Sequence, residues 1–154
     1  MKRLMLLLAA AALAAAAVLP LSAGAKPKTV TPAAEIISHV KIISDSGDTA
    51  TVKARYICPE GNHLWVSAKQ SADGTKDSAL EGEGSSGAAT GWLQNHPGNF
   101  TCDGKSHVGT FVVDNVTEYG KGPLRRGVAW VQFCIVSEAT EALILSRSEW
   151  VKVK

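Results

Sequence analysis

The sequence of 154 residues lacks the groupings that enzymes and cofactor-binding proteins carry. It has no Gly-x-Ser-x-Gly turn, and no other pattern gathers a nucleophile, a base and an oxyanion hole. Gly82 to Gly87 fits the dinucleotide fingerprint by letter, but neither the preceding strand nor the following helix that phosphate binding needs is predicted. Among the four histidines and three cysteines, Cys102 and His107 alone have zinc-ligand spacing, and they lack a second pair. We therefore expect no enzyme, no cofactor and no metal site.

An excess of charge of one sign is also missing. The chain has 16 basic and 14 acidic residues, but two of the basic residues, Lys2 and Arg3, lie in the amino-terminal segment described next. The rest of the chain is neutral, so it lacks the basic field that favours nucleic acid or an anionic membrane surface. We expect neither as a partner.

The amino terminus carries the strongest pattern in the sequence. Lys2 and Arg3 precede an apolar run from Leu4 to Val18, and Ala23-Gly24-Ala25 forms a small-x-small cleavage site. This order is typical of a secretory signal peptide, and the run is shorter than the roughly 20 apolar residues of a membrane span. We predict a signal peptide over residues 1–25 and a secreted, extracellular protein.

After the signal peptide, we expect a flexible segment over residues 26–34 and one domain over residues 35–154. Apolar residues recur at strand-like intervals, and no amphipathic helical stretch is present. An all-β, antiparallel β-sandwich is favoured, with a partly open barrel as the alternative. The seven predicted strands are Ile36–Ile43, Ala50–Cys58, Leu64–Gln70, Gly87–Leu93, His107–Asn115, Gly127–Val136 and Leu143–Val153.

Period-two alternation assigns faces to two of these strands. In Ala50–Cys58, the alternate residues from Val52 to Cys58 are apolar and should point into the core. In Gly127–Val136 both faces are apolar, and the set that includes Gln132 and Cys134 is less suited to the core. We expect the core set to be Ala129, Val131, Phe133 and Ile135, with the other face partly covered.

Three cysteines in an exported chain predict one disulfide and one remaining thiol. Alternation points Cys58 inward and assigns Cys134 to the other face, so a bridge between these two is disfavoured. Cys102 lies in a turn-like segment and has no such constraint. We favour a Cys58–Cys102 disulfide and expect Cys134 to be a buried free thiol with a packing role.

The tryptophans offer the best functional indication. Trp65 and His63 have opposite parity to Leu64 and Val66, so they should face outward if the latter form the core. Trp92 precedes a turn-rich segment that can present it. Outward aromatic rings can bind sugars or apolar ligands, whereas the alternative is that the tryptophans cap the core.

Residues 71–86 are rich in Ser, Gly and charged residues, and we expect this segment to be a mobile surface excursion between strands.

Four motifs together resemble a family of small secreted actinobacterial proteins of unknown function. They are Tyr56-Ile57-Cys58-Pro59, Leu64-Trp65-Val66-Ser67-Ala68-Lys69-Gln70, Thr101-Cys102-Asp103-Gly104-Lys105-Ser106-His107 and Val131-Gln132-Phe133-Cys134. The resemblance implies a secreted immunoglobulin-like sandwich in which Cys58 and Cys102 form the bridge. It implies no activity, ligand or catalytic residue.

The function expected from these observations is that of a monomeric, secreted, non-enzymatic binding or interaction module, with a cell wall or polysaccharide as the candidate ligand. Its candidate surface aromatic site consists of Trp65, Trp92 and His63. One alternative is a carrier of a small apolar ligand, which requires a concave apolar pocket. Another is a small protease inhibitor, which requires a rigid protruding loop.

Overall fold

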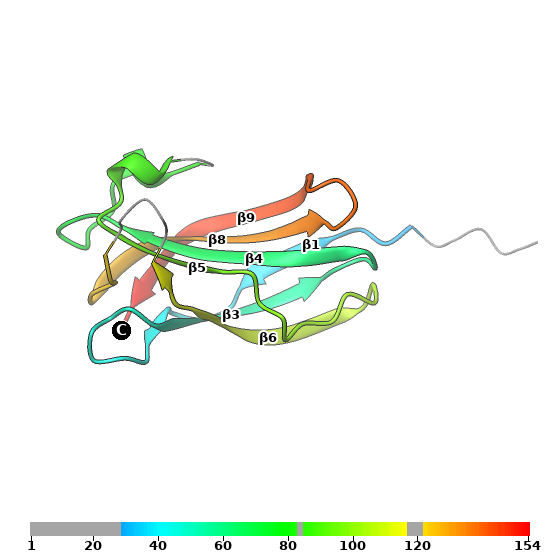
Figure 1. Ribbon diagram of the computed structural model, residues 1–154, viewed down its shortest axis with the longest axis horizontal. Coiled ribbons are helices and arrows are strands. Elements are labelled where there is room, and N and C mark those ends of the chain that lie inside the picture. Colours follow the sequence, from blue (N-terminus) through cyan, green and yellow to red (C-terminus); the bar gives the residue numbers. More distant parts are fainter. Residues whose placement is uncertain (1–28, 83–84, 117–121) are drawn as a thin grey trace, which may run out of the picture.

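The computed structural model describes residues 29–82, 85–116 and 122–154 (Figure 1). The predicted signal peptide and residues 26–28 lie outside the described residues. The described ranges contain nine strands and two short 3₁₀ helices, η1 (Ser78–Leu80) and η2 (Ser85–Ala88). They contain no helix with the length and apolar character of a membrane span.

The first of two sheets is centred on β3 (Ala50–Ile57). On one side β3 pairs with β6 (Ser106–Val113), and on the other with β1 (Ala33–Ile36) and β2 (Lys41–Ile42). All three pairings are antiparallel.

The second sheet has the strand order β7-β5-β4-β8-β9, and all its neighbours are antiparallel. Its strands are β4 (Asn62–Gln70), β5 (Gly91–Asn95), β7 (Asn115–Val116), β8 (Gly127–Ser137) and β9 (Leu143–Val153). The two sheets face each other (Figure 1), and a parallel bridge between Val40 and Val153 joins their edges. The predicted antiparallel β-sandwich is confirmed.

Strand boundaries differ from the prediction where the chain changes sheet or turns. The predicted strand Ile36–Ile43 is two strands, β1 and β2, because the chain bends at Ser38 between them. β1 begins at Ala33, two residues before the predicted start of the domain. The predicted strand Gly87–Leu93 is displaced to β5, because residues 87–88 belong to η2. β6 ends at Val113, and Asn115 belongs to β7 in the other sheet.

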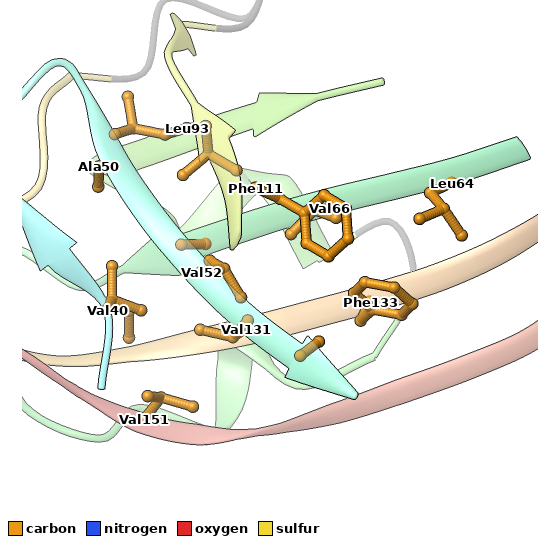
Figure 2. Close-up of a cluster of buried hydrophobic side chains, with 14 of the residues drawn as sticks. Val40, Ala50, Val52, Leu64, Val66, Leu93, Phe111, Val131, Phe133 and Val151 are labelled. Atoms are coloured by element: carbon orange, nitrogen blue, oxygen red, sulfur yellow. The ribbon is translucent and has the colours of Figure 1, made fainter. Parts of the chain in front are cut away.

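The core lies between the sheets and has the composition that alternation predicts (Figure 2). Residues at alternate positions of β3, from Val52 to Tyr56, are buried, as are Leu64, Val66 and Ala68 of β4. The predicted core set of β8 is also confirmed. The rings of Tyr56, Phe111 and Phe133 lie 5.5–5.8 Å apart between the sheets, so aromatic side chains fill this part of the interior.

The disulfide joins Cys58 to Cys102, as predicted, with 4.5 Å between their Cα atoms. Cys58 follows the end of β3, and Cys102 lies in the segment that crosses from β5 in one sheet to β6 in the other. The Gly104 N–H donates a hydrogen bond to the Cys58 carbonyl at 2.9 Å, so a second contact fixes this connection to the end of β3. Cys134 is buried and outside the disulfide, as expected.

Replacing both Cys58 and Cys102 with Ala should lower the free energy of unfolding by about 4 kcal/mol, because the bridge closes a loop with a sequence separation of 44 residues. Urea unfolding measures this loss. Cys134→Ala is the control, since it removes a sulfur without removing a cross-link, and its loss should be much smaller. Equal midpoints for the two variants would contradict the stabilising role of the bridge.

Candidate functional site

The outer face of the five-stranded sheet carries all four tryptophans. The register aligns Trp92 of β5 with Lys69 of β4, Lys69 with Trp130 of β8, and Trp130 with Trp150 of β9. Side chains directly opposite each other on one face of a sheet are in contact range. A row across this face is therefore formed by Trp92, Lys69, Trp130 and Trp150. Trp130 and Trp150 have ring centroids 5.4 Å apart. Trp65 lies on the same face of β4, four residues before Lys69.

The connection from β4 to β5 lies over one face of the five-stranded sheet (Figure 1), where its Leu80 packs with the tryptophans. Leu80 of η1 is fully buried, and with Ala89 and Trp92 it forms a second apolar cluster against which the other three tryptophans pack. Glu81 accepts a hydrogen bond from the Trp150 indole nitrogen at 2.8 Å. The segment over residues 71–86 is a surface excursion, as predicted, since most of its described residues are exposed, and it packs on the sheet through Leu80. Leu80 is the one large apolar side chain of η1, and it docks this part of the segment on the tryptophans.

Lys69 is buried at the centre of the row, with 1% of its surface exposed. Its ammonium donates to the Gly82 carbonyl at 3.2 Å and lies 5.6 Å from the Trp92 ring centroid. A buried ammonium is costly unless hydrogen bonds or aromatic faces replace its hydration. Lys69 therefore helps to hold the covering segment against the sheet.

Trp92 is only 6% exposed, so the expectation that it presents its ring at the surface is wrong. The covering segment, and not the turn after β5, decides its environment. Trp65 and His63 do face outward, as alternation predicts, and both are partly exposed.

Beyond the covered row, the outer face opens into a hollow of about 260 Å³. It lies where β4 begins, β8 ends and β9 begins. Residues that line it are His63, Trp65, His96, Cys134, Val136, Glu141 and Leu143. The hollow thus combines an indole ring, two imidazoles and a carboxylate with an apolar floor.

Cross-strand register explains how these residues meet. Gln94 of β5 pairs with Ser67 of β4, so His96, two residues further along, is placed beside Trp65. The rings of His63 and His96 are 5.6 Å apart. Glu141, in the turn between β8 and β9, places Oε2 at 3.8 Å from Nε2 of His63. The polar groups of the hollow therefore come from three different loops or strands.

The turn that carries Glu141 is strained. Glu141 has a φ of 54°, and no other non-glycine residue in the described ranges has a positive φ. Its N–H donates to the Ser137 carbonyl at 2.9 Å, and Ser137 in turn donates to the Ala142 carbonyl at 2.9 Å. A left-handed conformation costs a residue with a Cβ about 1–2 kcal/mol, and Gly or Asn would adopt it more easily. An acidic residue at this position is thus not required by the turn.

Cys134 forms part of the floor of the hollow. It pairs with Trp65 across the sheet, and its thiol donates to the Ser146 hydroxyl at 3.6 Å. In the described part of the chain, no group of three or more His, Cys, Asp or Glu residues is arranged to hold a metal ion. The arrangement is suited to non-covalent binding of a ring-shaped ligand with hydroxyl groups, for which the indole offers a flat surface and the imidazoles and carboxylate offer hydrogen bonds.

His96, Glu141 and Leu143 line this site but were not predicted from the sequence. Alternation along β5 could have indicated His96, because it continues the parity of Trp92. No local signal indicates Glu141, which reaches the hollow only because the β8–β9 hairpin folds back beside β4.

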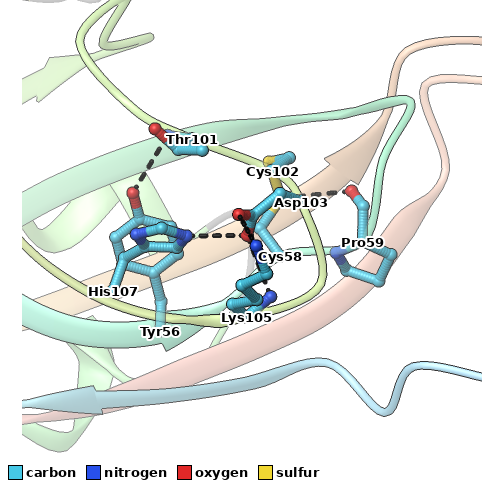
Figure 3. Close-up of polar contacts among 8 residues, drawn as sticks. All are labelled: Tyr56, Cys58, Pro59, Thr101, Cys102, Asp103, Lys105 and His107. Atoms are coloured by element: carbon cyan, nitrogen blue, oxygen red, sulfur yellow. Dashed lines mark hydrogen bonds and ion pairs between the residues drawn. A yellow bond between two sulfur atoms is a disulfide. The ribbon is translucent and has the colours of Figure 1, made fainter.

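A second polar cluster surrounds the disulfide (Figure 3). Asp103 Oδ1 lies 2.7 Å from His107 Nε2 and accepts a hydrogen bond from the Lys105 N–H at 2.9 Å. The hydrogen bond with His107, then that with Lys105, lowers the pKa of the Asp103 carboxyl from 3.8 to about 2. Tyr56 completes the cluster, since its hydroxyl accepts from the Thr101 N–H at 3.2 Å. These bonds connect the Cys102 turn to β3 and β6, which indicates a structural role.

Asp103→Asn should lower the unfolding temperature at neutral pH, and the unfolding temperature of this variant should change less as the pH falls. The ionised carboxylate stabilises the fold fully above about pH 4, and this contribution disappears as pH falls towards the folded-state pKa of about 2. Thermal unfolding of both proteins between pH 2 and pH 6 tests this. Asp45→Asn, at an exposed carboxylate outside the cluster, is the control. Parallel pH profiles for wild type and Asp103→Asn would contradict the assignment.

Leu80→Ala should destabilise the protein by about 2–5 kcal/mol, because it removes a fully buried side chain from the covered row. Tryptophan emission should shift to the red as water reaches the indoles. The matched control is Leu143→Ala, whose leucine is 49% exposed, and its effect should be far smaller. Similar losses for the two variants would show that the covering segment does not dock through Leu80.

No family model and no curated protein matches this chain.

Proposed function

We propose that this protein is a secreted, non-enzymatic, monomeric binding module, and that the hollow beside Trp65 binds a sugar ring of a cell-wall or other extracellular polysaccharide. The observation that carries the proposal is the placement of Trp65, His63, His96 and Glu141 around one opening of about 260 Å³. Pockets for drug-sized ligands occupy about 300–1,000 Å³, so this opening suits a single ring.

Export is supported by two features. The amino-terminal pattern over residues 1–25 is that of a signal peptide. The Cys58–Cys102 disulfide is of a kind that persists in oxidising compartments. Both agree with the resemblance to small secreted actinobacterial proteins of unknown function.

We also propose that the sandwich is immunoglobulin-like. Its support is the strand arrangement, in which β1, β3 and β6 share one sheet while β4, β5, β8 and β9 share the other. The parallel bridge between Val40 and Val153 also places the residue directly before β2 beside the end of the last strand, β9. In such sandwiches, binding sites commonly lie at loops clustered at one end. The hollow occupies such an end.

The two other functions that the sequence suggested have less support. A carrier would hold its apolar ligand in a concave pocket, whereas the rings of Tyr56, Phe111 and Phe133 pack on one another between the sheets. An inhibitor would present a protruding loop, whereas the long connection from β4 to β5 docks on the sheet through Leu80.

Purified secreted protein should be retained on at least one insoluble polysaccharide or cell-wall preparation, and Trp65→Ala should weaken that retention by about tenfold because the stacking surface is lost. Glu141→Asn should also weaken it, while the turn keeps a residue that tolerates its positive φ. Pull-down with each support measures both effects.

Val112→Ala, at an exposed residue of β6 on the other sheet, is the control and should bind as wild type does. Circular dichroism verifies that each variant is folded. Retention on no support, or equal retention of wild type and Trp65→Ala, would refute the proposed function.

A further inference from the structure

A second hollow, of about 400 Å³, lies at the other end of β8 and β9. Its lining consists of Arg126, Gly127, Lys152, Val153 and Lys154. Three of these residues are cationic and none is acidic. This local excess of positive charge stands out because the chain without its predicted signal peptide is neutral.

The three cations are available to a ligand. Arg126, Lys152 and Lys154 are exposed, and no hydrogen bond or ion pair to their side chains is present within the described ranges. Where Lys154 ends the chain, its α-carboxylate offsets one of these charges and leaves two. Asp73 lies in the adjoining turn, but its Oδ1 accepts from Ser71 and Thr75 within that turn.

The backbone that carries Arg126 is held in place by a buried amide. Gln70 is 1% exposed, and its Nε2 donates to the Arg125 and Val128 carbonyls at 2.9 and 3.1 Å. Its Oε1 accepts from the Arg125 N–H at 2.8 Å. Gly127 also packs directly on Gly74, where a Cβ would come within 2.4 Å of the Gly74 carbonyl oxygen. The position of Arg126 is thus fixed by contacts on both sides.

The backbone that carries the two lysines is held in the same way. The backbone N–H of Val40 donates to the Lys152 carbonyl at 2.9 Å, and the backbone N–H of Lys154 donates to the Val40 carbonyl at 3.0 Å. Buried Val151 and Val153 alternate with the lysines and direct both ammonium groups to the outer face of the sheet. Cations on a fixed backbone lose less conformational entropy on binding than cations on a mobile loop.

We propose that this basic hollow binds an anionic group, a carboxylate or a phosphate, on an extracellular polymer. A guanidinium binds the two oxygens of such a group in a fork, and two ammonium groups nearby supply further charge-assisted hydrogen bonds. The site is independent of the Trp65 hollow, which lies at the opposite ends of the same strands.

The test is binding of the secreted protein to polygalacturonate, which carries carboxylates, to polyphosphate, and to neutral dextran, each at 20 mM and 200 mM salt. At low salt we expect binding to at least one of the two polyanions and not to dextran, with weaker binding at high salt because charge pairs are screened. The polyanion that binds identifies the anionic group.

Lys152→Glu and, separately, Arg126→Glu should weaken binding about tenfold or more. The matched control is Lys53→Glu, which changes the net charge equally at an exposed lysine of β3. Equal weakening by Lys53→Glu would overturn the proposal in favour of a diffuse charge effect. Failure to bind either polyanion at 20 mM salt would also overturn it. Retention through Trp65 is assigned by Trp65→Ala and binding through the basic hollow by Lys152→Glu and Arg126→Glu, and these variants lie in different hollows, so the two proposals fail independently.

Discussion

The pairing of β4 with β8 is the constraint on which the rest of this structure depends. Their register runs from Asn62 opposite Ser137 to Lys69 opposite Trp130, and both faces of the pair are buried over much of its length. One face contributes Leu64, Val66, Val131 and Phe133 to the core between the sheets. A slip of one residue would exchange this apolar face with the face that carries Ser67, Lys69 and Gln132. The register is therefore strongly determined by the core.

The same register divides the outer face into regions with different chemistry. At one end of the strands, Trp92, Lys69, Trp130 and Trp150 form a row that η1 covers. At the other end, Trp65 is partly exposed, and the imidazoles of His63 and His96 line the same hollow. The covering segment thus buries Trp92 and packs against the other tryptophans, of which Trp65 also lines an opening. A binding role is proposed for that ring alone.

Alternation along single strands was sufficient to predict the sandwich, the core sets of β3 and β8, and the Cys58–Cys102 disulfide. These properties depend on local side-chain direction, which sequence parity reports directly. The environment of Trp92 was not predictable in this way, because Leu80 buries it from a segment whose composition is that of a loop. His96 and Glu141 were also missed as neighbours of His63. Alternation along β5 indicates the face of His96, but its neighbours depend on pairing between strands, and the position of Glu141 depends on a hairpin turn.

The most direct test of this account is an NMR titration of the four tryptophan indole N–H signals with oligosaccharide fragments of a retained polysaccharide. We expect the Trp65 signal to shift with ligand concentration, while the Trp92 signal beneath the covering segment stays in place. Shifts at Trp92 and Trp150 without a shift at Trp65 would contradict it, because the ligand would then bind where the structure places a covered, structural cluster.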